Sequence, residues 1–247
     1  MTKIIIVGAK GRMGQAIDRI SKGVEGAEVV ARIDVGDSLE DVLPKGDVVI
    51  DFSHHSCGVA VAQATAKEGK ALVVGTTGHS AEDKAAILAV GTQIPVIFSP
   101  NYSIGVNVLF HLTREAARLM WDADQEIIEM HHNKKKDAPS GTAARLIEIL
   151  LEEKKKATGR EDILMHGREG EVGARTQNEI GVHSLRGGDV VGDHTVMFAS
   201  LFERVELTHK ASSRDAFAIG AIRAALWLHR KGKTSGVYEM ADVLGLR

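Results

Sequence analysis

Along residues 3–101, short apolar runs alternate with segments of helical periodicity. The runs are rich in valine and isoleucine and barely alternate with polar residues, as in strands that are buried on both faces of a parallel sheet. This pattern predicts a doubly wound α/β domain of the Rossmann type. The predicted strands are residues 3–8, 28–34, 47–52, 71–75 and 95–99, and the helices between them begin near Gly11, Ser56 and Ser80.

The pattern changes after residue 102. Residues 103–122 predict a longer amphipathic helix whose apolar positions recur every three or four residues. Those positions are Ile104, Val108, Leu112, Ala116 and Leu119. Strands predicted at 125–132, 179–186, 190–199 and 202–210, with a helix at 142–156, indicate a smaller α+β domain with a mixed or antiparallel sheet. With one good helix to cover that sheet, we expect another subunit to close one of its faces.

Residues 214–230 predict a further helix, followed by a short terminal segment. Its apolar stripe comprises Phe217, Ile219, Ala221, Ile222, Ala225 and Leu226. A stripe this broad suits a helix that packs back against the first domain. The chain is therefore expected to form one domain from residues 1–102 and 214–247 and a second from residues 103–213.

Composition narrows the possible functions. The chain has 247 residues, 44% of them apolar and 26% charged, with a formal net charge of −2, which is typical of soluble globular proteins. The near balance of charge and the 4% aromatic content argue against a nucleic-acid-binding protein. The single cysteine excludes an internal disulfide and a multi-cysteine metal site. Small molecules are the expected partners.

The chain offers neither a membrane span nor a targeting segment. Its apolar runs are far shorter than the roughly 20 residues that a bilayer crossing requires. The first strand begins directly at the N-terminus and leaves no room for a signal peptide. We therefore expect a cytoplasmic protein without membrane contact.

A glycine-rich turn, Gly8-Ala9-Lys10-Gly11-Arg12-Met13-Gly14, joins the first predicted strand to the first helix. Its spacing differs from the usual dinucleotide-binding pattern by one residue, but the physical basis is the same. Missing side chains let the backbone approach a pyrophosphate, and the helix start offers N–H groups and partial positive charge. Asp34 follows about 20 residues after Gly14, where an acidic residue can bind ribose hydroxyls. The sequence favours dinucleotide binding over an ordinary tight turn.

The charges around this turn leave the choice of cofactor open. Asp34 alone would favour NAD by repelling a 2′-phosphate. Lys10 and Arg12 could instead reach that phosphate, or could be solvated surface side chains. We expect both NADH and NADPH to be used.

Two polar loops leave the carboxyl ends of predicted strands. They are Gly75-Thr76-Thr77-Gly78 and Ser99-Pro100-Asn101-Tyr102-Ser103. Ligands bind at this edge of open parallel sheets, so the hydroxyl and amide groups could position a nicotinamide ring. The alternative is that either is simply a polar loop.

The densest polar stretch is residues 129–143, Glu-Met-His-His-Asn-Lys-Lys-Lys-Asp-Ala-Pro-Ser-Gly-Thr-Ala. Neighbouring strand residues face opposite ways, so His131 and His132 do not suit one metal ion. Three lysines and two histidines create a positive field that suits a substrate bearing carboxylates. Ser140-Gly141-Thr142 adds an anion cradle at a helix start, and a histidine or lysine here can donate a proton. The alternative is a solvated lysine turn followed by a capped helix.

Two lesser features lie near the predicted cofactor edge. His54 and His55 are expected to form a loop and helix cap, although they lie close to that edge. Cys57 is expected to be a packing residue, because no partner that would activate its thiol is identifiable.

These motifs together resemble the 4-hydroxy-tetrahydrodipicolinate reductase (dihydrodipicolinate reductase) family of lysine and diaminopimelate biosynthesis. The resemblance rests on the glycine turn, Gly75-Thr-Thr-Gly78, Asn101-Tyr-Ser-Ile-Gly-Val-Asn107, residues 129–143 and residues 214–228. It implies reduction of 4-hydroxy-tetrahydrodipicolinate by hydride transfer. It also implies that His131 is the acid at the reduced ring, with Lys135 as proton donor or charge stabiliser. The residues implied to bind the two substrate carboxylates are His132, Ser140, Gly141 and Thr142.

The resemblance further implies a homotetramer joined through the sheets of the second domain, with NADH or NADPH on the first. The implied cofactor-binding residues are Gly8, Lys10, Gly11, Arg12, Met13, Gly14, Asp34, Gly75, Thr76, Thr77, Ser99, Asn101 and Tyr102. An arginine that follows the acidic residue in some relatives is missing here, so a cofactor preference cannot be carried over. Lys10 and Arg12 could compensate for it.

Three other functions compete with this one. A semialdehyde dehydrogenase needs an activated cysteine in its catalytic region, whereas Cys57 lies in the cofactor half. An amino-acid dehydrogenase does not account for the lysine-flanked histidine pair. A non-catalytic nucleotide sensor would bind the cofactor without oxidising it in response to a substrate.

Overall fold

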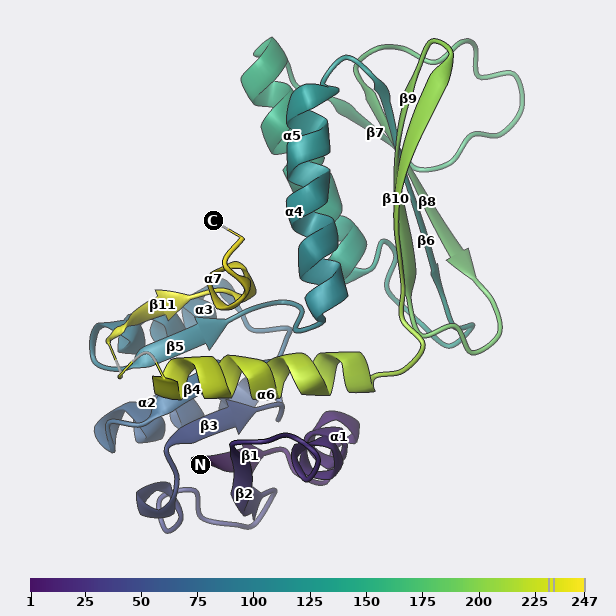
Figure 1. Ribbon diagram of the computed structural model, residues 1–247. Coiled ribbons are helices and arrows are strands. Elements are labelled where there is room, and N and C mark those ends of the chain that lie inside the picture. The colour runs from purple at the N-terminus through teal and green to yellow at the C-terminus, as the bar shows by residue number, and fades with distance from the viewer. Residues whose placement is uncertain (231, 233, 247) are drawn as a thin grey trace. The chain divides into compact units, whose positions relative to one another are not determined.

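The computed structural model describes residues 1–230, 232 and 234–246, and the chain divides into two compact units. The first unit comprises Met1–Ile104 and Arg214–Arg247, and the second comprises Gly105–Ser213. The chain thus leaves the first unit once and returns to it once (Figure 1).

A six-stranded sheet forms the centre of the first unit, in the order β11-β5-β4-β3-β1-β2. All of its neighbouring strands are parallel, which confirms the predicted doubly wound domain. The strands are β1 (Thr2–Val7), β2 (Ala27–Ile33), β3 (Val48–Asp51), β4 (Ala71–Val74), β5 (Pro95–Phe98) and β11 (Gly236–Tyr238). The edge strand β11 was not predicted, because its three residues follow a helix and carry no apolar run of their own.

Helices cover both faces of this sheet, and successive residues of β1 show why its sequence barely alternates. Ile4 and Ile6 pack in one core with α1 and α6, whereas Ile5 and Val7 pack in a second core with α2 and α3. The helices are α1 (Arg12–Ser21), α2 (Gly58–Lys67), α3 (Ala81–Ala89), α6 (Asp215–Arg230) and α7 (Met240–Leu244). Short 3₁₀ turns are η1 (Leu43–Lys45), η2 (His55–Cys57) and η3 (Val90–Thr92).

Helix α6 runs alongside β3, β4 and β5 (Figure 1). The predicted stripe was only partly correct, because Ile219 is 37% exposed while Ala218 and Ala224 are fully buried. The reason is close packing. A Cβ atom added to Gly220 would lie 1.7 Å from the Tyr102 carbonyl oxygen, so the helix approaches the sheet edge with its smallest residues.

A five-stranded mixed sheet, in the order β10-β9-β6-β8-β7, forms the second unit and confirms the predicted mixed sheet. Strands β6, β8 and β7 are parallel, whereas β9 is antiparallel to both β6 and β10. The elements are α4 (Ile104–Leu119), β6 (Asp124–His131), α5 (Gly141–Thr158), β7 (Ile163–Met165), β8 (Glu179–Arg186), β9 (Asp193–Ser200) and β10 (Glu203–Lys210).

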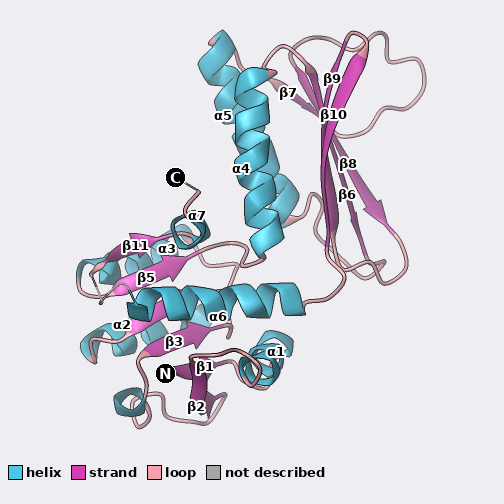
Figure 2. Cartoon of the chain, in the orientation of Figure 1, coloured by secondary structure: helices cyan, strands magenta, loops and turns pink. Residues whose placement is uncertain are grey.

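Two helices rather than one cover this sheet, which corrects the prediction of a single covering helix. Leu109 and Ala117 of α4 join Leu146 and Leu150 of α5 in one core against strands that include β6 (Figure 2).

The apolar stripe predicted for α4 was largely wrong, although its Ala116 packs against the core. Val108, Leu112 and Leu119 are exposed, and the buried face comprises Val106, Leu109, Thr113 and Ala117. Thr113 and Ala117 are small enough to bring α4 close to the sheet, although they contribute little to an apolar pattern.

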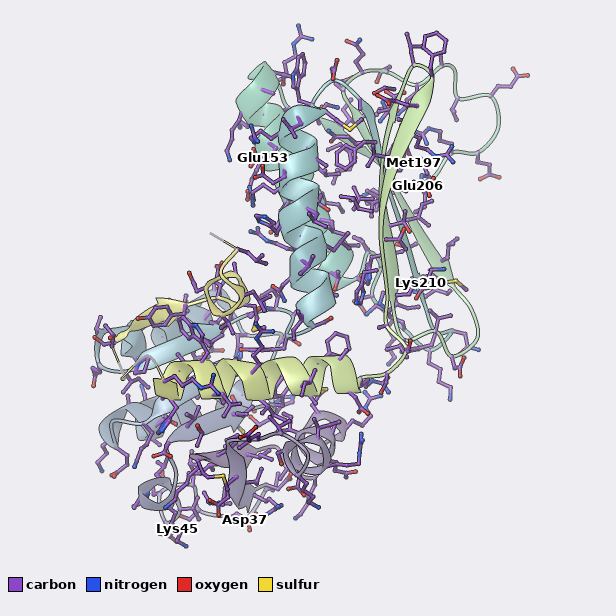
Figure 3. All side chains as sticks on the ribbon, in the orientation of Figure 1. Asp37, Lys45, Glu153, Met197, Glu206 and Lys210 are labelled. Carbon is purple, nitrogen blue, oxygen red and sulfur yellow. The ribbon has the colours of Figure 1, made fainter. Side chains whose placement is uncertain are left out.

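The opposite face of the second sheet carries mixed side chains. Val196 and Phe198 of β9 are buried in the core, so Met197 between them points to the other face, as does its neighbour Glu206 on β10 (Figure 3). Within the part of the chain that the structure describes, no helix has both the length and the apolar character needed to span a bilayer.

Candidate functional site

The glycine turn of the first unit is shaped by two close approaches of the backbone. Gly8 has φ +80°, and a Cβ atom there would lie 2.4 Å from the Phe52 carbonyl oxygen. A Cβ atom on Gly14 would lie 2.2 Å from the Gly8 carbonyl oxygen. Helix α1 begins at Arg12 with Gly11 as its N-cap, with no side-chain cap and no acidic residue in its first turn. Its first N–H groups can therefore receive a phosphate.

Asp34 stabilises this turn directly. Its carboxylate accepts hydrogen bonds from the backbone N–H groups of Lys10, at 2.7 Å, and Val35, at 2.9 Å. The bond from Lys10 and then that from Val35 lower the pKa of Asp34, so its carboxylate stays ionised at neutral pH. A fixed negative charge thus lies next to the glycine turn.

A cavity of about 530 Å³ opens beside the turn, at the carboxyl edge of the parallel sheet. Its lining includes seven of the predicted cofactor-binding residues, namely Arg12, Met13, Gly75, Thr76, Thr77, Asn101 and Tyr102. The other predicted residues lie outside this lining. The glycine turn contains Gly8, Lys10, Gly11 and Gly14, and Asp34 binds the backbone of that turn. Ser99 is buried, and its hydroxyl donates to the Asn101 carbonyl oxygen at 2.8 Å.

Tyr102 lines the cavity, and its hydroxyl is bound to the protein backbone. The hydroxyl lies 2.7 Å from the Val74 carbonyl oxygen and 3.2 Å from that of Ile97, so it is bound to the ends of β4 and β5. It therefore holds two strand ends together at the cavity wall.

Six lining residues were not predicted to bind the cofactor: Phe52, Ser53, His54, His55, Pro100 and Phe217. Phe52 and Ser53 follow β3 at the same edge of the sheet, and that position alone could have identified them. His54 accepts a hydrogen bond from the Ser56 N–H at 3.3 Å, as expected for a cap. Phe217 comes from α6, far away in sequence; it belongs to the predicted apolar stripe, but no local pattern marks it as a cavity residue. Cys57 is exposed, so its expected packing role was wrong.

In the second unit, residues 129–143 connect the end of β6 to the start of α5. His131 ends the strand and is 8% exposed, and its Nδ1 lies 2.5 Å from Glu129 Oε2. Ser140 caps α5, because its hydroxyl accepts a hydrogen bond from the Ala143 N–H at 3.2 Å. Lys135 Nζ lies 2.9 Å from Asp137 Oδ2. The strand end, the lysine loop and the helix start thus form one continuous segment.

Glu129 connects the predicted residues. It is fully buried and accepts hydrogen bonds from both terminal nitrogens of Arg186, at 2.9 and 3.0 Å, as well as from His131. The backbone N–H of Ser140 also donates to it, at 3.3 Å. Burial favours the neutral acid, but side-chain hydrogen bonds with Arg186, His131 and Ser184 outweigh it and lower the pKa of Glu129.

His131 and His194 lie close together at this site but differ in burial and in the charges around them. Burial lowers the pKa of His131; Glu129 opposes this shift, whereas Lys135 and Arg186 add to it. His194 is more deeply buried, which lowers its pKa to about 4 and keeps the ring neutral at pH 7. Its Nε2 lies 3.1 Å from the Ser140 hydroxyl, and its ring centre lies 5.2 Å from that of His131.

The structure thus brings His131, Ser140, Gly141 and Thr142 to one end of the second sheet, with His132 and Lys135 in the adjoining loop. Lys134 and Lys136 are exposed. Arg186 and His194 were missed from the sequence. His131 pairs with Arg186 across β6 and β8, and such a pairing between distant segments leaves no local pattern.

Two family models together match almost the whole chain. The model of the dihydrodipicolinate reductase N-terminus matches residues 2–102, and that of its C-terminus matches residues 105–244. The chain belongs to the dihydrodipicolinate reductase family. It is 51% identical over 249 residues to the 4-hydroxy-tetrahydrodipicolinate reductase of Akkermansia muciniphila. This alignment covers all of this chain and 99% of that protein. It is 46% identical over 271 residues to that of Anaeromyxobacter dehalogenans strain 2CP-C, with the same coverage.

Solved structures show the same fold at low identity. Dipicolinate-bound dihydrodipicolinate reductase from Paenisporosarcina sp. TG-14 matches with a TM-score of 0.79 and 22% identity, over 98% of both chains. Diaminopimelate dehydrogenase from C. glutamicum matches with a TM-score of 0.57 and 13% identity, over 97% of this chain and 92% of that one.

Family membership confirms the resemblance and the predicted reductase function with its nicotinamide cofactor. As a member of this family, the protein is an oxidoreductase of lysine and diaminopimelate biosynthesis that acts on a small molecule.

Proposed function

We propose that this protein reduces 4-hydroxy-tetrahydrodipicolinate to tetrahydrodipicolinate with NADH or NADPH. In this proposal the first unit is the dinucleotide-binding domain, and the second is the substrate-binding and oligomerisation domain. The observation that carries the proposal is the shared hydrogen-bond network of Glu129, which joins an imidazole that can donate a proton to a helix start that can bind an anion.

The residues of the first unit fit a dinucleotide. Gly8 and Gly14 leave no space for side chains, so the turn keeps its backbone open to a pyrophosphate. Asp34 is placed to bind ribose hydroxyls, and Lys10 and Arg12 can compensate its charge when a 2′-phosphate is present. Ser99 and Tyr102 support the cavity wall through their hydroxyl hydrogen bonds. When bound, the cofactor supplies the hydride.

The second unit fits a dicarboxylate. The N-terminus of α5 carries no acidic residue in its first turn, so Gly141 and Thr142 can offer N–H groups to a carboxylate. His132 and the Ser140 hydroxyl complete the proposed binding set. After the substrate loses its hydroxyl as water, a cyclic conjugated imine accepts the hydride, and a proton from His131 or Lys135 completes the product.

The negative charge of the substrate favours protonation of His131 in the complex. In the free protein the lowered pKa of His131 favours neutral imidazole. Two carboxylates bound nearby raise that pKa by favouring the charged ring. Binding of the dianion is thus coupled to uptake of the proton that the reaction consumes.

We also place the protein in the cytoplasm as a homotetramer joined through the second sheet. Exposed apolar residues on that unit support the assembly. Leu185 is 49% exposed, Ile163 is 54% exposed, and Phe202 is fully exposed at the β9–β10 turn. Light scattering coupled to size exclusion tests the assembly, and a monomer at micromolar concentration contradicts it.

The activity is tested by following the absorbance of the reduced nicotinamide after the product of the preceding synthase is added. We expect substrate-dependent oxidation with both cofactors and none with an unrelated keto acid. Oxidised cofactor with diaminopimelate serves as the control for an amino-acid dehydrogenase. Cofactor binding without oxidation would instead support a nucleotide sensor.

A further inference from the structure

Glu129 lies at the centre of the second unit's polar cluster, and none of its surface is exposed. Its Oε1 accepts hydrogen bonds from Arg186 Nη2 and the Ser140 N–H, and its Oε2 accepts from Arg186 Nη1 and His131 Nδ1. An imidazole and the start of α5 are therefore held by the same carboxylate. No role in binding or proton transfer accounts for this buried group, because its oxygens are already occupied by the protein.

The hydrogen bond to Glu129 determines which nitrogen of His131 carries a proton. An ionised carboxylate can only accept hydrogen bonds, so Nδ1 must be the donor. Neutral His131 then has its proton on Nδ1 and a bare Nε2, and protonated His131 can transfer its second proton only from Nε2. The geometry thus selects one tautomer and one reactive atom.

Arg186 keeps Glu129 ionised in this buried position. The guanidinium binds both carboxylate oxygens, the geometry in which arginine pairs most strongly with carboxylates. Arg186 also donates to the Asp137 carbonyl oxygen at 2.7 Å, which attaches the loop that carries Lys135 to the same pair. Because the guanidinium balances the carboxylate, His131 is oriented without being converted into a permanent cation.

We propose that Glu129, paired with Arg186, is a positioning residue that fixes His131 in the Nδ1–H tautomer and holds it in register with the start of α5. The inference rests on the proposed function, since it assigns His131 the proton transfer. Glu129 itself does not touch the substrate. Its contribution is to direct Nε2 as the reacting nitrogen.

The same strand supplies a matched control. Glu126 lies on the other face of β6, where its Oε2 is 2.7 Å from His183 Nε2 and its carboxylate also binds Arg168 and Arg175. Glu126→Gln therefore removes a carboxylate that is paired with a histidine and with arginines, as Glu129→Gln does. It leaves residues 129–143 unchanged.

The experiment combines nitrogen NMR of the histidine rings, without substrate and at a pH where His131 is neutral, with steady-state kinetics. The His131 signals are assigned by their loss in His131→Gln. We expect the wild-type proton on Nδ1 and a mixture of tautomers in Glu129→Gln. We expect kcat to fall at least about 10-fold in that variant while KM changes less than about 3-fold. In Glu126→Gln, kcat should stay within about 2-fold and the His131 tautomer should be unchanged.

A wild-type His131 with its proton on Nε2 overturns the proposal, and this result does not depend on any variant folding. A Glu129→Gln protein that keeps the Nδ1–H tautomer overturns it as well, whether or not kcat falls. If wild-type protein shows the expected tautomer but no reductase activity, the proposed function fails and the positioning of His131 stands.

Discussion

Replacing His131 with glutamine tests whether this imidazole is the proton donor of the reaction. Glutamine preserves a polar side chain beside Glu129 but cannot release a proton. A general acid contributes about 10²- to 10⁴-fold to a rate, or about 3 to 5 kcal/mol of transition-state stabilisation. The full loss is expected only where wild-type His131 is protonated.

The surroundings of His131 set how large the loss is at a given pH. Burial lowers its pKa from the ordinary value of 6.5. In the free protein less than about one quarter of the molecules therefore carry the imidazolium at pH 7. A lowered pKa means that the acid form is complete only at lower pH and disappears as the pH rises. The ratio of wild-type to variant kcat/KM is therefore expected to increase as the pH falls from about 8 to 6.

The measurement is kcat/KM for wild type and His131→Gln across this pH range, with cofactor affinity measured separately by fluorescence titration. His183→Gln is the control, because His183 also pairs with a glutamate of β6 but on the other face of the sheet. Its kcat/KM is expected to follow wild type at every pH. A ratio for His131→Gln that is close to one, or that increases toward high pH, would refute the role of His131 as an acid.

Four further results are expected. Lys135→Ala should lower kcat at least about 10-fold and leave cofactor affinity nearly unchanged; wild-type turnover would remove Lys135 from the mechanism. Gly14→Ala should weaken cofactor binding at least about 10-fold in a titration, because its Cβ would lie 2.2 Å from the Gly8 carbonyl oxygen; undiminished affinity would show that the turn does not hold the pyrophosphate. NADH and NADPH should differ less than about a hundredfold in kcat/KM, and a larger preference would show that one of the opposing charges at the turn has no effect. Burial raises the pKa of Glu126, but hydrogen bonds from Arg168, His183 and Arg175 outweigh it and lower that pKa to about 2, so its contribution to stability is complete above pH 4.5 and disappears as the pH falls toward 2. Urea titrations should accordingly show Glu126→Gln less stable than wild type by up to about 3 kcal/mol at pH 7, with the difference shrinking below pH 4.5, and equal stability at pH 7 would contradict this prediction.

The parallel sheet was predictable because its sequence signal is local. Ile4 to Val7 of β1 alternate between two cores, so this stretch is apolar throughout; β3 and β4 are likewise buried along their whole length, whereas β2 exposes Glu28 and Arg32. The polar block at residues 129–143 was equally visible, since its functional groups lie within one strand end, one loop and one helix start.

Helix α4 shows that the periodicity of apolar residues alone does not determine which face of a helix is buried. Its sequence carries apolar residues on two faces, and the spacing of Val108 and Leu112 predicts the face that proves to be exposed. The structure buries Leu109 and Ala117 instead, on the face that also carries the small residue Thr113. Only the partner surface decides between two such stripes, and that surface is not encoded locally.

Arg186 and His194 illustrate a second limit. Both come from strands that pair with β6, and they reach the site through the registers His131↔Arg186 and Glu129↔His194. A shift of one residue in either register would turn these side chains to the opposite face. The sequence patterns are local and do not predict the register between distant strands. They therefore could not identify the residues that reach the site through that register.

In the proposed function, the helix starts of the two units allow one small protein to bind two anions without a strongly basic composition. Neither α1 nor α5 carries an acidic residue in its first turn, a property shared by α2 and α4, whereas α3 carries Glu82 and Asp83 there. An acidic first turn stabilises a helix but repels an anionic ligand. At α1 and α5 no such repulsion opposes the anionic ligands of the proposed function, which can bind the backbone N–H groups of the helix starts. In the proposed function, backbone N–H groups share anion binding with His131 and Lys135, so replacing either side chain is expected to lower kcat more than substrate affinity.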